Sequence, residues 1–314
     1  MAYHTSKDDK QQMKQLVILS GKGGTGKTSL AAAFAHLAQE SPFSLKAVLA
    51  DADVDAANLE LVLRPRKLEE HDFRGGSVAL IDENLCQGCG TCEQICRFEA
   101  IIPPGSRNGL NYQVDPIACD GCAACLYQCP ELAIHMEIEL AGRWFRSESR
   151  YGPLFHAELR PAHENSGKLV TLVKQQARLL GLDTRADLVI VDGPPGIGCP
   201  VISAASGADL ALIVTEPTAA AIHDMERVLE MTRHFRLPAI ICINKADIYP
   251  EGALKIQNFC QQNHIEMLGC IPFDVTITRA IVNGEPVTAY QPDSPASRAL
   301  LKLWEQVSDR LSVS

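Results

Sequence analysis

The sequence predicts an α/β fold in which a doubly wound, mostly parallel sheet carries a small inserted α+β domain. Three observations lead to this prediction. Short apolar runs alternate with helical stretches, which is the pattern of a parallel sheet covered by helices on both faces. A glycine-rich loop joins the first apolar run, Leu16–Leu19, to the first helix. Eight of the 12 cysteines fall in two regular arrays between residues 86 and 129, inside the larger domain.

The composition limits the class of protein. The chain has 314 residues, of which 46% are apolar, enough for one large domain and a small insert. It has 29 basic and 38 acidic residues, and 29 − 38 gives a net charge of −9 with histidine neutral. An acidic chain without a basic run argues against a nucleic-acid partner. No apolar run approaches the roughly 18 residues of a membrane span.

The N-terminus and the cysteines indicate a cytoplasmic protein. Residues 1–14 are polar and charged without an apolar core, so they are expected to form a flexible arm and not a secretory signal. The regular cysteine spacing indicates metal binding in place of disulfides. Metal-bound thiolates are typical of a reducing compartment, and we therefore place the protein in the cytoplasm.

The glycine-rich loop is the clearest functional signal. Residues 21–28 read Gly-Lys-Gly-Gly-Thr-Gly-Lys-Thr and fit the pattern G-x-x-x-x-G-K-[ST] of a phosphate-binding loop. The loop follows an apolar strand and opens a helix, as the motif requires. Its backbone N–H groups and the helix N-terminus then surround the phosphates. Lys27 is expected to reach the β- and γ-phosphates, and the Thr28 hydroxyl to hold Mg²⁺.

Lys22 gives this loop the form K-G-G-x-G-K-[ST]. The loop resembles the deviant phosphate loop of the MinD/ParA/nitrogenase-iron-protein ATPases. The resemblance implies ATP as the nucleotide and a homodimer in the ATP-bound state, in which Lys22 reaches the partner's nucleotide. It also implies catalytic roles for Lys22 and Lys27. The loop residues that it implies for ATP binding are Gly23, Gly24, Thr25, Gly26, Lys27, Thr28 and Ser29.

Carboxylates follow the second predicted strand, Leu45–Ala50. Such residues lie beside the phosphate loop when parallel strands end at the same edge. In the family this D-x-D segment is switch I. The resemblance assigns Asp53 to the attacking water, as the catalytic carboxylate, and places Asp51 nearer the metal. Both could instead cap the following helix.

The two cysteine arrays have the same spacing. Each reads C-x2-C-x2-C-x3-C, which is the signature of a bacterial ferredoxin with two [4Fe–4S] clusters. In this signature the fourth cysteine of each array ligates the other cluster. One predicted cluster is therefore held by Cys86, Cys89, Cys92 and Cys129, and the other by Cys96, Cys119, Cys122 and Cys125. Zinc is the competing interpretation, because paired C-x2-C motifs also bind zinc.

Short β-rich segments flank the arrays, at residues 77–81 and 133–138, and could close the ferredoxin module. We expect the insert to span residues 64–149, with the clusters within 77–140. The ATPase domain then comprises residues 15–63 and 150–314. Strands at 144–145 and 154–159 are expected to lead back to the ATPase domain. Its further strands are expected at 188–191, 209–214 and 239–243, and its helices at 167–180 and 218–235.

The apolar strand at 188–191 ends in Asp192. An aspartate in this position matches Walker B, where it orients the Mg²⁺ shell, and Gly193 resembles switch II. Cys199 follows Asp192 by seven residues, and a cluster-binding cysteine of the nitrogenase iron protein follows its switch II aspartate at the corresponding distance. A small buried residue is the simpler interpretation of Cys199. The remaining cysteines, Cys242, Cys260 and Cys270, are expected in the core.

The last strand leads into Asn244-Lys245-Ala246-Asp247, an N-K-x-D motif. In phosphate-loop NTPases this segment frames the base, so Asn244 and Asp247 are predicted base contacts, and residues 271–274 resemble the segment on its other side. The final helix, Ala296–Leu311, has acidic residues and few lysines. It is expected to dock on the sheet and not to bind a membrane.

Together these motifs predict an ATPase with an inserted two-cluster ferredoxin module. The first hypothesis is nucleotide-dependent dimerisation coupled to electron transfer toward an unknown redox partner. The second is an iron–sulfur carrier or assembly ATPase of the Mrp type, with clusters as cargo. The third is a ParA- or MinD-like nucleotide switch whose clusters sense redox state.

Overall fold

The computed structural model describes residues 13–40, 42–106, 111–160, 166–218 and 220–312. The chain divides into two compact units. The larger unit takes residues 1–70, 144–158 and 166–314, and the smaller unit takes residues 71–143 and 159–165. The expected insert, 64–149, is thus wider at both ends than the main segment of the smaller unit. Residues 1–12 of the expected arm lie outside the described residues, and Lys14 already belongs to the first strand.

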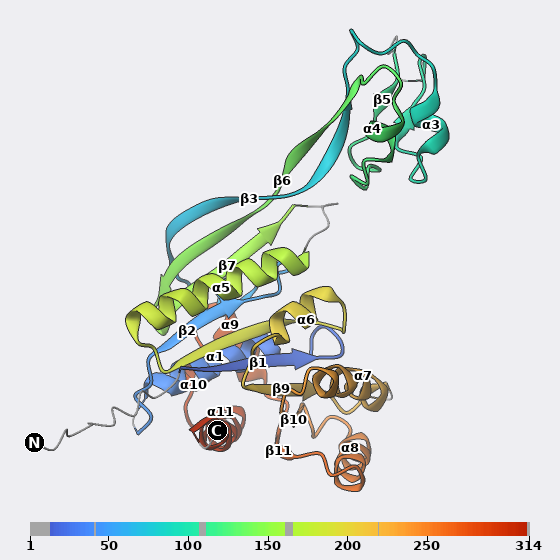
Figure 1. Ribbon diagram of the computed structural model, residues 1–314. Helices are drawn as coiled ribbons and strands as arrows, with labels where there is room; N and C mark the ends of the chain where they lie inside the picture. The colour runs from blue at the N-terminus through green and yellow to red at the C-terminus, as the bar shows by residue number, and fades with distance from the viewer. Residues whose placement is uncertain (1–12, 41, 107–110, 161–165, 219, 313–314) are drawn as a thin grey trace, which may run out of the picture. The chain divides into compact units, whose positions relative to one another are not determined.

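In the described part of the chain, nine strands form one sheet in the order β11-β10-β9-β1-β8-β2-β7-β6-β3 (Figure 1). These strands are β1 (Lys14–Ser20), β2 (Ala47–Asp51), β3 (Arg66–Ile81), β6 (Ile134–Ser149), β7 (Gly152–Leu159), β8 (Leu188–Pro195), β9 (Leu210–Thr215), β10 (Ala239–Asn244) and β11 (Met267–Ile271). The run from β11 to β7 is parallel. The predicted α/β class and mostly parallel sheet are confirmed.

The sheet is built around β1. Leu16, Val17, Ile18 and Leu19 are all fully buried, because β1 lies between β8 and β9 and has helices on both faces. Parallel strands place their carboxyl ends at one edge. The residues that follow β1, β2 and β10 therefore share that edge, along with the C-terminal end of β8.

Helices cover both faces of the sheet. In Figure 1, α5 and α6 lie in front of the strands, whereas α1 packs with α2, α10 and α11. The helices of the larger unit are α1 (Lys27–Gln39), α2 (Leu59–Leu63), α5 (Ser166–Thr184), α6 (Cys199–Ala205), α7 (Ala221–His234), α8 (Pro250–Gln262), α9 (Val275–Asn283), α10 (Val287–Tyr290) and α11 (Pro295–Ser312).

The final helix docks as expected. Trp304 of α11 is fully buried, and its ring centroid lies 5.0 Å from that of Phe34 on α1. Phe43 adds an edge contact at 5.9 Å. The apolar face of α11 is therefore used inside the larger unit, and no helix among the described residues is long and apolar enough to span a membrane.

The segments 77–81 and 133–138 correct one expectation. They are not separate short strands, because residues 77–81 end β3 and residues 134–138 begin β6, strands of 16 residues each in the nine-stranded sheet. Both segments lie in the smaller unit, and their closing of a ferredoxin module stays a prediction. The first seven residues of β3 are exposed and mostly charged. A strand without a buried face lacks the apolar alternation by which strands are recognised in sequence.

The smaller unit has short elements around a small core. Its helices are α3 (Thr91–Ile95) and α4 (Ala124–Gln128), and β4 (Ile101–Ile102) pairs antiparallel with β5 (Gln113–Val114). The core consists of Ala79, Cys92, Ile101, Cys125 and Ile134. This is a cysteine-rich insert with a two-stranded sheet, and the ferredoxin fold of the insert stays a prediction.

Candidate functional site

The phosphate loop, residues 21–28, connects β1 to α1. Gly26 has φ 96° and stands before the first helical residue, Lys27. A Cβ at Gly26 would also lie 2.3 Å from the side-chain nitrogen of Asn244. Both the backbone conformation and the close approach therefore require glycine at this position.

Lys27 is buried inside this loop. Its ammonium donates a hydrogen bond to the Ser20 hydroxyl at 2.8 Å, and that hydroxyl donates to the Lys22 carbonyl at 2.6 Å. Burial lowers the pKa of Lys27, while Asp192, Asp53 and other nearby carboxylates raise it. These negative charges favour the protonated form that phosphate binding requires. Ser20 was not singled out in the sequence, because a serine at the end of a strand carries no motif of its own.

Asp51 has a structural role in this geometry. Its fully buried carboxylate accepts hydrogen bonds from the backbone N–H groups of Asp53 (3.1 Å), Asn58 (3.0 Å) and Leu59 (2.9 Å). These bonds hold both ends of the segment 52–58. Burial, and then the charge of Asp192, raise the pKa of Asp51 well above its ordinary value. Direct metal ligation by Asp51 stays a prediction.

Asp192 lies on β8, in register with Ile18 of β1 and Asp51 of β2. Its carboxylate is buried, and neither oxygen has a hydrogen-bond partner among the described residues. Burial raises the pKa of Asp192 to about 6, although the nearby Thr28 hydroxyl and Lys27 ammonium lower it. A buried, unpaired carboxylate beside a hydroxyl suits Mg²⁺, which prefers oxygen ligands. Thr28 and Asp192 therefore fit the predicted metal.

Asp53 follows β2 at the same edge and is partly buried. Burial raises its pKa and the charge of Lys27 lowers it, while Asp55 raises it further. The electrostatic contact with Lys27 shows that Asp53 lies near the phosphate loop. Its position is compatible with the predicted catalytic role, which stays a prediction.

The second lysine of the loop is held by two residues of its own chain. The Lys22 ammonium donates to the Thr218 hydroxyl at 3.2 Å and lies 3.6 Å from Glu216 Oε2. Glu216 also pairs with Lys245, whose ammonium lies 2.5 Å from Oε1 and donates to the Gly24 carbonyl at 3.3 Å. Glu216 thus joins two lysines beside the loop. The sequence did not indicate this contact, since Glu216 lies far from both lysines along the chain.

The N-K-x-D segment reaches the loop from β10. Asn244 is buried, donates to the Thr25 carbonyl at 2.8 Å and accepts from the Lys245 N–H at 3.0 Å. Asp247 accepts from the Phe273 N–H at 2.6 Å. In this structure Asn244 supports the phosphate loop and Asp247 fixes the segment beyond β11. Their contacts with a base stay predictions.

Two cysteine expectations need correction. Cys199 is exposed and not buried, because it is the first residue of α6, directly after the loop beyond Asp192. Cys270 is also exposed, since it lies on β11, which forms an edge of the sheet. Cys242 and Cys260 are buried as expected.

In the smaller unit, the predicted cluster ligands line cavities. A first cavity is lined by Cys86, Cys89, Cys92 and Cys129. A second cavity is lined by Cys96, Cys119, Cys122 and Cys125. These are the same two sets of four that the spacing assigns, with the fourth thiol of each set taken from the other array. Among the described residues no three His, Cys, Asp or Glu side chains converge on one metal ion.

The two arrays also have the same backbone conformation. Positive φ angles occur at the second residue after the first cysteine of each array, Gly88 (73°) and Gly121 (71°). They recur two residues later, at Gly90 (76°) and Ala123 (60°). Each array thus turns tightly between its first and third cysteines, as a loop that wraps around a cluster would require.

Backbone N–H groups point at the sulfur atoms. The Ala100 N–H donates to Cys96 Sγ at 3.4 Å, and the Ala133 N–H donates to Cys129 Sγ at 3.4 Å. The two bonds occupy equivalent positions, four residues after the last cysteine of each array. Hydrogen bonds to cluster sulfurs are one of the ways in which proteins set a reduction potential. The residues present therefore fit two iron–sulfur clusters.

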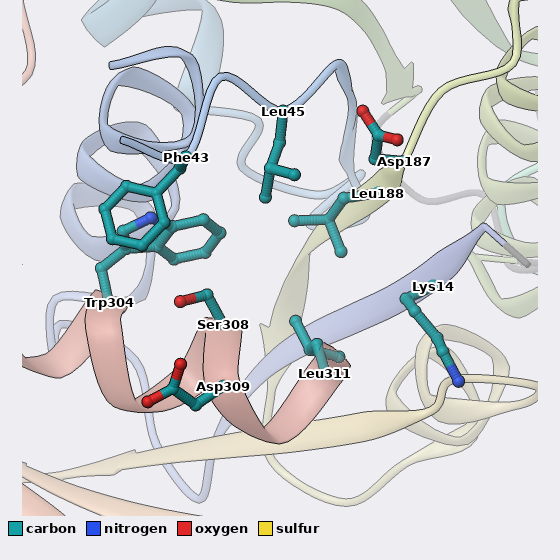
Figure 2. A pocket seen from close by; sticks show the side chains of 9 residues that line it. All are labelled: Lys14, Phe43, Leu45, Asp187, Leu188, Trp304, Ser308, Asp309 and Leu311. Atoms are coloured by element: carbon teal, nitrogen blue, oxygen red, sulfur yellow. The ribbon is translucent and has the colours of Figure 1, made fainter. Parts of the chain in front are cut away.

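A third cavity lies away from this chemistry. Its lining includes Phe43, Trp304, Lys14 and Leu188 (Figure 2). Lys14 and Leu188 are the first residues of β1 and β8, whereas the phosphate loop follows the last residue of β1. The cavity is therefore at the opposite edge of the sheet and belongs to neither candidate site.

Comparison with known proteins gives a consistent picture. The pattern of the CobQ/CobB/MinD/ParA nucleotide binding domain matches residues 16–287. The uncharacterized protein MJ0578 of Methanocaldococcus jannaschii is 31% identical over 301 residues, which cover 94% of this chain and 96% of the relative. The iron–sulfur cluster carrier protein of Pyrococcus horikoshii is 31% identical over 162 residues, 46% of this chain and 53% of that protein.

A solved structure shows the same fold. The septum site-determining protein MinD of Pyrococcus horikoshii, complexed with Mg-ADP, aligns with a TM-score of 0.55 and 20% sequence identity. The alignment covers 94% of this chain and 96% of that protein. At this level of identity the likeness establishes the fold alone.

Proposed function

The chain belongs to the CobQ/CobB/MinD/ParA nucleotide-binding family of P-loop ATPases, and from this premise we propose that it couples ATP binding and hydrolysis to electron transfer through two [4Fe–4S] clusters. One observation carries the proposal. The eight cysteines of the insert surround two cavities in the sets of four that a two-cluster ferredoxin requires. An ATPase with two such clusters has the parts needed to link nucleotide state to electron transfer.

The nucleotide would bind at the carboxyl edge of the sheet. The phosphate loop and Lys27 hold the phosphates, and Thr28 and Asp192 hold Mg²⁺, which neutralises phosphate charge when bound. Asp53 orients the attacking water and accepts its proton. Its position near Lys27 and its raised pKa support this assignment, because a higher pKa makes the carboxylate a better base at neutral pH.

Lys22 would change partners between nucleotide states. In the single chain its charge is balanced by Glu216, and the ammonium donates to Thr218. In an ATP-bound homodimer it would leave these residues and contact the nucleotide of the partner subunit. The attraction to Glu216 must then be replaced by attraction to phosphate, which ties dimer formation to the triphosphate state.

The cysteine sets would hold the clusters as resident cofactors. Each cluster exchanges one electron at a time when bound. The sulfur-directed N–H groups of Ala100 and Ala133 stabilise negative charge on the ligands and so favour a reduced cluster. The acceptor or donor of the electrons would be a separate redox protein.

A second candidate function is cluster carriage or assembly. It is favoured by the relatives named iron–sulfur cluster carrier proteins, which match about half of this chain. A carrier must release its clusters. Each cavity here takes three cysteines from one array and the fourth from the other, which favours retention of a cluster. The redox function is therefore our first proposal.

An anaerobic redox titration followed by EPR tests the proposal. The Asp53→Ala variant would be titrated with ADP and with ATP, because it should hold ATP without hydrolysing it. For one electron, a tenfold change in redox equilibrium corresponds to about 59 mV. A shift of that size between nucleotides supports coupling. No shift, together with transfer of iron and sulfide to an apo-acceptor, would favour the carrier function. A protein that binds zinc in place of iron would overturn both.

A further inference from the structure

The two cavities of the smaller unit are built from corresponding residues. Each is lined by the first three cysteines of one array, by the fourth cysteine of the other, and by neighbours at the same offsets from these cysteines. Three pairs of neighbours differ in polarity or charge. With the residue of the first cavity named first, they are Thr91 and Ala124, Gln87 and Asp120, and Glu131 and Phe98.

Thr91 brings a hydroxyl to the first cavity. Its oxygen lies 3.4 Å from Cys89 Sγ, within hydrogen-bond distance for sulfur. A thiolate that ligates iron has no proton, so the hydroxyl must be the donor. The corresponding residue of the second array, Ala124, has no hydroxyl to offer Cys122. Cys89 and Cys122 are both exposed, so this donor distinguishes two otherwise similar ligands.

The backbone donors do not distinguish the cavities. The Ala133 N–H donates to Cys129 Sγ, which lines the first cavity, and the Ala100 N–H donates to Cys96 Sγ, which lines the second. Both distances are 3.4 Å. Their effects on the two clusters would therefore be equal.

The charged neighbours leave little difference. Each lining has one carboxylate, Glu131 in the first cavity and Asp120 in the second. Both residues are exposed, so water and salt screen their charges, and Glu131 also accepts a hydrogen bond from the Gln87 amide at 3.2 Å. Arg97 directly follows Cys96, but it is exposed and does not line the second cavity.

Tyr112 is a polar residue that lines the first cavity alone. The hydrogen bond of its hydroxyl goes to the Glu93 carboxylate, and this bond raises the pKa of Tyr112. The hydroxyl has a single proton, which is then directed at Glu93 and not at a cysteine sulfur. Thr91 therefore remains as the side-chain donor that separates the two cavities.

We propose that Thr91 is a positioning residue that acts through Cys89 and gives the cluster of the first cavity a higher reduction potential than that of the second. The inference rests on the proposed function, because it requires both clusters, and it adds the order in which they fill. A hydrogen bond to a ligand sulfur stabilises negative charge and so favours the reduced form. A first electron given up by the redox partner would therefore reduce the cluster held by Cys89, and a second electron the other cluster.

The test is an anaerobic redox titration of the iron-loaded protein without nucleotide, followed by EPR. Thr91→Val removes the hydroxyl and keeps the shape of the side chain, whereas Thr91→Ser keeps the hydroxyl. Ala124→Ser adds a hydroxyl to the second array, whose backbone has the same conformation at this turn. Thr184→Val is the matched control, because it removes an exposed hydroxyl of α5 in the larger unit.

We expect two one-electron transitions in the parent. Thr91→Val should change the redox equilibrium of the higher one by roughly fivefold, which lowers its potential by roughly 40 mV at about 59 mV per tenfold change, and should leave the lower one in place. Thr91→Ser and Thr184→Val should keep both potentials. Ala124→Ser should raise the lower potential by a similar amount and so reduce the separation.

Coincident potentials in the parent would overturn the inference, as would a Thr91→Val protein in which the lower potential, both potentials or neither had moved. If Thr91→Val lost its iron, Ala124→Ser would decide, and an unchanged lower potential in that variant would overturn the inference. Failure of the proposed function would appear separately, as potentials that do not differ between ADP and ATP in the Asp53→Ala variant, because the present comparison uses no nucleotide.

Discussion

Asp192 should make the protein less stable when Mg²⁺ is absent. Its carboxylate is buried without a hydrogen-bond partner among the described residues, and its pKa is about 6 compared with an ordinary 3.8. Because the folded chain raises this pKa, the ionised carboxylate opposes folding at neutral pH. A difference of about two pH units corresponds to about 3 kcal/mol at 1.36 kcal/mol per pH unit.

The direction of this pKa shift determines how the stability depends on pH. Between about pH 4 and pH 6 the folded chain binds the proton of Asp192 more tightly than the unfolded chain. The free energy of unfolding therefore falls as the pH rises through this window, and this contribution is constant above it. Asp192→Asn cannot ionise, so it should be more stable than the wild type at pH 7 by up to about 3 kcal/mol, with a weaker dependence on pH. At 2–4 °C per kcal/mol, the rise in Tm is roughly 6 °C or more.

The measurement is thermal unfolding in EDTA without nucleotide, at pH 5 to 8, followed by tryptophan fluorescence. Both tryptophans, Trp144 and Trp304, lie in the larger unit, so the signal reports that unit. Asp209→Asn is the control. Asp209 accepts the Gln15 N–H at 2.7 Å, and its loss should leave stability unchanged or lower. An Asp192→Asn protein that is less stable than the wild type in EDTA would refute the reasoning.

A second part of the experiment tests the metal. Mg-ADP at 100 times its Kd should stabilise the wild type by about 2.7 kcal/mol. Asp192→Asn lacks the charged ligand, so its gain should be much smaller at the same concentration. An equal gain in both proteins would show that Asp192 does not hold Mg²⁺.

Three other predictions follow from the same geometry. Lys27→Ala should abolish nucleotide binding in calorimetry, whereas Lys22→Ala should keep binding and lose the concentration-dependent part of ATP hydrolysis; full activity of Lys22→Ala would contradict the dimer mechanism. Cys129→Ser should remove the EPR signal of the cluster in the first cavity, and Cys96→Ser should remove that of the cluster in the second. If each array instead binds its own cluster, each variant would lose the opposite signal. Asn244→Ala should weaken ATP binding roughly fivefold, because it removes a buried hydrogen bond of about 1 kcal/mol from the loop; unchanged affinity would show that the loop needs no such support.

The sequence predicted those features that local chemistry determines. The phosphate loop was predicted from its glycines and lysines. The central strands were predicted from short apolar runs, which are typical of strands buried on both faces of a sheet. The pairing of cysteines into two sets follows from spacing alone, and the cavities have the same sets. The full length of β3 could not be predicted, because its first seven residues are exposed, mostly charged and carry no apolar alternation. Parts of β6 were expected as two short segments, at 133–138 and 144–145, and the structure joins them into one long strand.

Contacts between distant residues were also beyond the sequence. Asp51 and Asp192 cannot be distinguished in the sequence, since each follows an apolar run and is expected at the carboxyl edge of the sheet. Their roles differ because the chain returns after Asp51 and presents the Asn58 and Leu59 N–H groups to it, while no such group reaches Asp192. Glu216 joins Lys22 to Lys245 for the same reason, since only the folded sheet brings β9 beside the loop.

The crossed cysteine sets bear on the choice between redox and carrier functions. Cys129 lines the first cavity and lies just after α4, while Cys125, within α4, lines the second. If the two clusters bind as proposed, withdrawing Cys129 from one cluster would displace the helix that carries a ligand of the other. A carrier would have to open both cavities to deliver either cluster, and each opening would expose the shared core around Cys92 and Cys125. Such a site would retain its clusters, which supports the proposal that it releases electrons and not clusters.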